Sequence, residues 1–167
     1  MGIGETGYDI VKVLHILCAV VGFGGVLLNG VYAAQARKRP PAEGLAVMEA
    51  NVFVSNKIAK IAIYLTLVLG FGVVGMSDQQ IEFTDLWVMI SIILFIASLL
   101  VSELLLSPRV KKLVALQREI AEGPPPQGGP PPQVAQMKAL GGQVGGFSGF
   151  LHLSFVVILC LMVFQPT

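Results

Sequence analysis

Two histidines and two cysteines lie inside apolar stretches of this sequence, where a polar side chain is costly unless it has a partner or a function. His15 and Cys18 fall in "VKVLHILCAVVGFGGVLLNG" at residues 11–30, and His152 and Cys160 fall near the C-terminus. Imidazole and thiolate are ligands for haem iron and for soft metals such as copper. His15 is therefore the main candidate ligand for haem b or copper, and Cys18 and Cys160 are weaker candidates.

Both histidines also have a structural interpretation. A neutral imidazole can donate a hydrogen bond to a carbonyl or hydroxyl group on a neighbouring helix, and such contacts hold helices together in lipid. This interpretation needs no cofactor, and the sequence leaves it open beside the first.

A second group of polar residues is expected on the opposite side of the membrane from His15. This inner polar cluster consists of His152, Glu103, Lys60 and Asn29. A carboxylate beside an imidazole can pass protons, so one interpretation is a proton relay. The alternative is that Glu103 is a carboxylate at the membrane surface beside Arg109.

Motifs for other kinds of chemistry are missing from the sequence. It contains no Walker loop, no dinucleotide fingerprint, no HExxH and no nucleophile elbow. Nothing in it supports nucleic-acid binding.

The elements that would position these residues are membrane-spanning helices. The chain is 54% hydrophobic and 13% charged, whereas soluble domains carry about 25% charged residues. No Asp, Glu, Lys or Arg occurs in residues 13–36, 61–77, 86–102 and 139–167. Since a helix needs about 20 apolar residues to cross a bilayer, we predict four spans, at about 8–34, 52–76, 83–106 and 145–164.

These spans predict an all-α fold, a membrane-embedded four-helix bundle with antiparallel up-down order. The whole chain, 1–167, forms one domain. Ser107 and Pro108 resemble the N-cap and first position of a further helix, which we expect as a cytoplasmic extension after the third span. The Pro/Gly-rich segment at 123–132, "GPPPQGGPPP", is expected to be a semi-rigid cytoplasmic linker.

Small and polar residues recur at helical spacing and predict the packing faces of the spans. On the first span, Gly22 and Gly25 share a face with His15, Cys18 and Asn29. On the fourth, Gly142, Gly145 and Gly149 share a face with His152 and Val156. The equivalent faces on the second and third spans hold Ala59, Ala62, Thr66 and Gly70, and Ser91, Phe95, Ser98 and Ser102, respectively.

Basic residues predict the orientation. Ten of the eleven Lys and Arg residues follow the first or third span, and the loop "SDQQIEFTD" after the second has none. The positive-inside rule places both basic loops in the cytoplasm and both termini outside the plasma (inner) membrane. The first span lacks basic residues ahead of its apolar core, except Lys12, and is not expected to be a cleaved signal peptide.

The segments "VKVLHILCAVVGFGG" and "LTLVLG", with the basic first loop, resemble a superfamily of small four-helix membrane proteins. It includes HemJ-type protoporphyrinogen oxidases, CopD-type copper proteins and predicted membrane proteins of unknown function. The resemblance implies that His15 matches the first-span histidine that the HemJ type associates with haem and catalysis. That type also uses a lysine in its third span.

Three functions remain after this reasoning. The first is a haem- or metal-associated redox protein of the membrane with His15 as ligand. The second is a non-catalytic packing subunit, either as a homo-oligomer or within a larger membrane complex. The third, which no broken span or charged ring supports, is a small transporter. The lipid bilayer is the partner common to all three.

Overall fold

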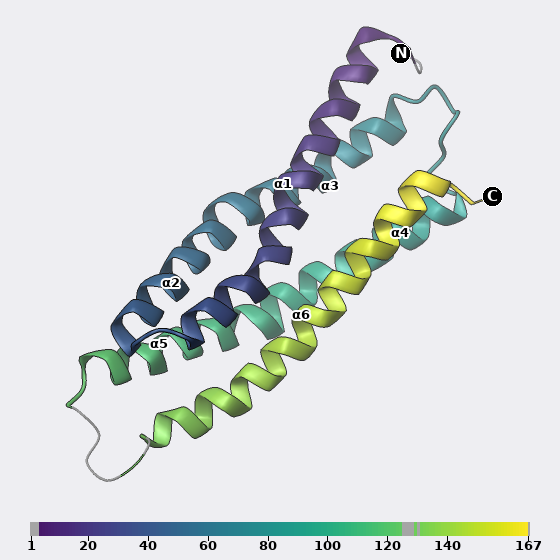
Figure 1. Cartoon of the computed structure of the whole chain (residues 1–167). Coiled ribbons are helices and arrows are strands. Elements are labelled where there is room, and N and C mark those ends of the chain that lie inside the picture. Colours follow the sequence, from purple (N-terminus) through teal and green to yellow (C-terminus); the bar gives the residue numbers. More distant parts are fainter. Residues whose placement is uncertain (1–3, 125–128, 130, 167) are drawn as a thin grey trace.

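The computed structural model describes residues 4–124, 129 and 131–166, and these form four long helical segments (Figure 1). The first is α1 (Thr6–Arg37) and the last is α6 (Pro132–Phe164). The second joins α2 (Pro41–Val54), η1 (Ser55–Ala59) and α3 (Lys60–Gly75). The third joins α4 (Leu86–Leu100), η2 (Val101–Leu106) and α5 (Ser107–Glu122). The predicted all-α fold is confirmed, and all four segments are long and apolar enough to cross a membrane.

Each helical segment is longer than a bilayer requires. The four contain 32, 35, 37 and 33 residues, whereas about 20 residues cross the hydrocarbon core. At roughly 1.5 Å per residue the segments reach about 50 Å. The apolar part of each segment is therefore continued by a more polar helical part at one end of the molecule.

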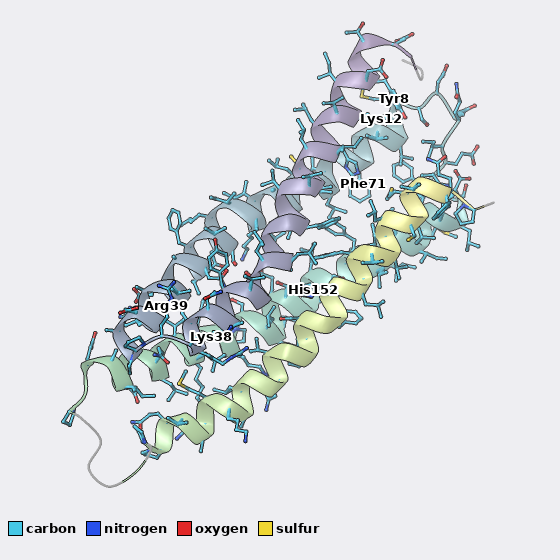
Figure 2. The ribbon with its side chains drawn as sticks, in the orientation of Figure 1. Tyr8, Lys12, Lys38, Arg39, Phe71 and His152 are labelled. Carbon is cyan, nitrogen blue, oxygen red and sulfur yellow. The ribbon has the colours of Figure 1, made fainter. Side chains whose placement is uncertain are left out.

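The two ends of the molecule differ in charge. The basic end contains the connection between α1 and α2, where Lys38 and Arg39 lie, and the end of α5 (Figure 2). The acidic end contains both termini and the loop 76–85, with Asp78, Glu82 and Asp85 (Figure 1). These two names are used below without reference to a side of the membrane.

The helices form two hairpins that meet at the basic end. In one, α1 packs along α3 and α2, and in the other, α6 packs along α4 and α5. The hairpins contact each other through α2 with α5 and through α1 with α6. Among the described residues the backbones of α3 and α4 do not approach each other closely, although one short loop joins them, and α3 reaches the central core through Ile63 and Leu67. The bundle is therefore closed at the basic end and diverges toward the acidic end (Figure 1).

Two turns of π-helix, η1 and η2, interrupt the second and third helical segments. The prediction that Ser107 caps a new helix is wrong, because the backbone stays helical through Ser107 (φ −56°, ψ −47°). Proline has no N–H and its ring clashes with the carbonyl four residues earlier. The wider turn of η2 ends at Leu106, two residues before Pro108, and accommodates the proline without a break.

The predicted inward faces of the second and third helical segments are confirmed. Buried residues there are Ala59, Ala62, Thr66, Ser91, Phe95 and Ser98. The prediction for α6 is wrong at Val156, which is 54% exposed, while Leu151, Ser154, Phe155 and Ile158 are buried. Three large apolar side chains and the small Ser154 face the interior of the bundle along α6, in place of the predicted glycines.

The glycines predicted to pack differ between α1 and α6. A Cβ on Gly22 would lie 2.7 Å from Ile63 Cγ1, and one on Gly25 would lie 2.7 Å from Ala59 Cβ. The glycines therefore allow α1 to approach the second helical segment closely. A Cβ on Gly142, Gly145 or Gly149 would meet nothing within 4 Å. Among the described residues, none of these three glycines packs against another helix of the same chain, because they lie on an exposed face of α6.

The predicted linker at 123–132 is only partly described. Residues 125–128 and 130 lie outside the described residues, and α6 begins at Pro132.

Candidate functional site

His15 lies on α1 and contacts α3. Its Nδ1 is 2.9 Å from the backbone carbonyl oxygen of Thr66. A carbonyl can only accept a hydrogen bond, so Nδ1 carries the proton and donates. The remaining ring nitrogen, Nε2, therefore carries a lone pair and can bind a metal.

The surface of α3 is shaped to receive this ring. A Cβ on Gly70 would lie 3.0 Å from Cε1 of His15 and 3.4 Å from its Nδ1, so the absence of a side chain lets the imidazole lie against the helix. One turn earlier, the buried Thr66 hydroxyl donates to the Ala62 carbonyl oxygen at 2.8 Å. The ring orientation is thus set by packing and by one hydrogen bond.

This bond suits both interpretations of His15. A histidine that only joins two helices makes such a bond. A metal-binding histidine makes it too, because the nitrogen that does not bind metal usually donates to a carbonyl or carboxylate.

The two cysteines do not join His15 in a compact ligand set. Both thiols are free; Cys18 is half-buried and Cys160 is exposed. They lie on α1 and α6, which diverge toward the acidic end (Figure 1). In the part of the chain that the structure describes, no three His, Cys, Asp or Glu side chains converge on one point.

Lys60 and Glu103 of the inner polar cluster form an ion pair. The Lys60 ammonium nitrogen lies 2.8 Å from Oε2 of Glu103 and 2.7 Å from its Oε1. Lys60 directly follows η1 and Glu103 lies within η2, so the pair joins the two π-helical turns. The side chains are 37% and 34% exposed.

Asn29 and His152 have separate partners. The Ser55 hydroxyl donates to Oδ1 of Asn29 at 2.9 Å, and Nε2 of His152 lies 3.3 Å from the Val26 carbonyl oxygen. The four residues of the inner polar cluster therefore make three separate contacts and do not form one connected group. Arg109 does not pair with Glu103; it donates to Gln143 and to the Leu105 carbonyl oxygen.

His15 and His152 lie at different levels along the axis of α1. His15 is itself on α1, while His152 bonds to Val26, eleven residues further along that helix. At roughly 1.5 Å per residue this is about 16 Å along the helix axis. The two imidazoles cannot bind one iron atom, as their predicted positions along the spans also indicated.

Several features of the site were absent from the sequence analysis. The π-helical turns and the Ser55 contact were not predicted, and neither was the choice of Lys60 as the partner of Glu103. Pro108 was a signal for η2, since a proline inside a long helix requires a local distortion. The stacked rings of Phe23 and Phe155 were also missed, because isolated aromatic residues in an apolar span give no pairing signal.

Comparison with known proteins gives a family but no characterised relative. No curated protein and no solved structure matches the chain. The profile of a family described as "Predicted integral membrane protein (DUF2269)" matches residues 9–166, which include all four helical segments. The chain therefore belongs to this family of integral membrane proteins, DUF2269.

Proposed function

We propose that this protein binds haem through Nε2 of His15 and acts as a redox-type protein of the membrane. The observation that carries the proposal is the hydrogen bond from Nδ1 of His15 to the Thr66 carbonyl oxygen. It fixes the tautomer that leaves Nε2 free, and it raises the basicity of that nitrogen as a ligand.

The residues near His15 fit haem better than copper. Haem iron is held in its ring and needs only one or two protein ligands, which a single oriented imidazole can supply. Copper sites use several nitrogen and sulfur ligands, and only Cys18 shares the face of His15. A bound haem would supply one-electron chemistry, and His15 would hold its iron within reach of lipid-soluble molecules.

The proposal is limited to haem binding. The third span, at residues 86–102, contains no lysine or histidine, so it departs from the lysine that the resemblance to HemJ-type oxidases implies. We therefore do not extend the proposal to protoporphyrinogen oxidation.

An absorption spectrum tests the proposal. The protein, produced in cells supplied with a haem precursor and purified in mild detergent, is expected to show a Soret band that shifts on reduction with dithionite. A colourless protein that also fails to take up added haemin would contradict haem binding.

We further propose that the basic end faces the cytoplasm of the plasma membrane. In a chain with Cys18 and Cys160 replaced by alanine, Gln80→Cys at the acidic end should react with a membrane-impermeant maleimide on intact cells. Gln136→Cys at the basic end should react only after the cells are permeabilised. Labelling of Gln136→Cys but not Gln80→Cys on intact cells would show that the basic end faces outward, which would contradict the proposed orientation.

The exposed glycines of α6 favour a second candidate function, that of a packing subunit. Gly141, Gly145 and Gly149 are spaced four residues apart, and close approach of helices in lipid uses small residues at this spacing. Gly145 and Gly149 are exposed and have free space around them. In this case another membrane helix would cover the face, and Gly145→Leu would reduce chemical cross-linking between copies or with the partner.

A further inference from the structure

A small cavity lies where the four helical segments meet. Its volume is about 30 Å³, and every segment contributes to its wall. Val26 comes from α1, Ile63 from α3, Phe95 and Ser98 from α4, Ser102 from η2, and Phe155 from α6. A cavity needs roughly 10–15 Å³ of volume that a water molecule can enter, and the water needs polar partners.

The polar partners lie on the side of the cavity toward the basic end. Ser98 is 3% exposed, and its hydroxyl donates to the Leu94 carbonyl oxygen at 2.8 Å, which leaves its oxygen free to accept from water. Ser102 lies one turn further along, within the π-helical turn η2. The site can therefore hold at least one water molecule.

The Lys60–Glu103 ion pair lies next to this polar side. Glu103 directly follows Ser102, and Lys60 is one turn before Ile63, which forms part of the wall. Both charged residues border the neutral runs 61–77 and 86–102 at the basic end. Each is about one-third exposed, so the carboxylate is accessible to water outside the cavity. His152, bonded to Val26 in the wall, is the other titratable group beside the cavity.

Aromatic rings close the cavity on its other side. Phe23 and Phe155 stack with ring centroids 4.2 Å apart and an interplanar angle of 16°. Phe95 packs against Phe23 at 6.2 Å. Phe95 is near the middle of the neutral run 86–102, so the rings lie near the middle of the membrane. Beyond these rings toward the acidic end, the buried hydroxyl groups of Ser91 and Thr66 already donate their protons to the Trp87 and Ala62 carbonyl oxygens of their own helices.

We propose that the cavity, Ser102 and the Lys60–Glu103 pair form a proton-access path from the basic end to the middle of the bundle, closed by Phe23 and Phe155. A proton from outside water binds the Glu103 carboxylate while the Lys60 ammonium keeps its own. Glu103 then passes that proton to cavity water held by Ser98 and Ser102, and returns to the ionised, paired form. Only a proton moves, so no oxidant or reductant is needed. The path is independent of haem binding at His15.

Removing one of the two stacked phenylalanine rings tests the path. The full-length protein is reconstituted into liposomes that contain a pH-sensitive dye, and a potassium diffusion potential drives proton entry. Phe155→Ala is expected to raise the proton flux at least tenfold over the wild type. Phe150→Ala is the matched control, since Phe150 is on the same helix but 39% exposed, and it should leave the flux at the wild-type value.

A second substitution separates a specific path from a general leak. Adding Ser102→Val to Phe155→Ala should return the flux to near the wild-type value, because it removes a water partner beside the cavity. If Phe155→Ala does not fold, Phe23→Ala replaces it in the same pair of measurements. A folded variant with wild-type flux would contradict the proposal, and so would a raised flux that Ser102→Val leaves unchanged.

Discussion

Gly25→Leu is expected to unfold the protein in detergent at a temperature at least 5 °C below that of the wild type. A Cβ at this position would lie 2.7 Å from Ala59 Cβ and 3.7 Å from its Cα. Ala59 has no side-chain rotamer that could relieve the clash, so α1 must move away from the second helical segment. Overpacking of this kind costs about 1–3 kcal/mol or more, and here it would also disturb the contact between His15 and α3.

Gly146→Leu is the matched control for Gly25→Leu. It introduces the same side chain into another helix, but a Cβ at Gly146 meets nothing within 4 Å. Its unfolding temperature should remain within about 1 °C of the wild-type value, since exposed substitutions away from packing contacts cost within about 0.5 kcal/mol. Equal losses in the two variants would show that α1 does not approach Ala59 as closely as described.

Breaking the Lys60–Glu103 pair is expected to destabilise the closed end of the bundle. Lys60→Met leaves Glu103 charged and unpaired, and Glu103→Gln leaves Lys60 charged and unpaired. Removal of one partner from a fully buried pair costs about 3–5 kcal/mol. These side chains are 37% and 34% exposed, so we expect a smaller loss of roughly 1–2 kcal/mol from each variant.

Two further variants show whether the loss comes from pairing. The double variant Lys60→Met with Glu103→Met leaves no unpaired charge and should recover most of the stability lost in the single variants. Lys57→Met removes a charge three residues from Lys60, at an exposed position, and should have little effect. Additive losses in the double variant would mean that the two side chains do not interact.

The extent of the helices was predicted in part. The neutral runs gave the four apolar spans, and a helix was expected after the third, where α5 lies, but the helix α2 and its packing on α5 were not predicted. Contacts between them, such as the Gln117 amide donating to the Pro41 carbonyl oxygen at 2.9 Å, join residues far apart in the chain. Such pairing stabilises helices whose own sequences are only moderately apolar, and no local pattern reveals it.

The inward faces were predicted best where small or polar residues face another helix. Thr66 and Ser98 both face another helix. Their hydroxyl groups donate to carbonyl oxygens of their own helices, and their small side chains allow close packing. On α6 the same rule selected Gly149, which is exposed, and missed Phe155, which is buried. A glycine marks a possible close approach, but the partner helix can lie in another chain.

His15 was identified from sequence because an imidazole is unusual in an apolar span. Its partner was not identifiable, since a backbone carbonyl of Thr66 has no sequence signature and Gly70 is one of 19 glycines. The separation of His152 from His15 did follow from antiparallel helices and residue counting. Sequence reasoning thus selected His15 as a candidate ligand, and the structure was needed to show that its Nδ1 donates to the Thr66 carbonyl oxygen.

Haem titration of matched histidine variants tests the central claim most directly. Wild-type protein, His15→Ala and His152→Ala are each titrated with haemin in detergent, and the Soret absorbance is followed against the haemin-to-protein ratio. We predict saturation at one haem per chain for the wild type and for His152→Ala, with nearly identical spectra, and no specific binding for His15→Ala. Equal binding by His15→Ala and the wild type would contradict the assignment of His15 as the ligand.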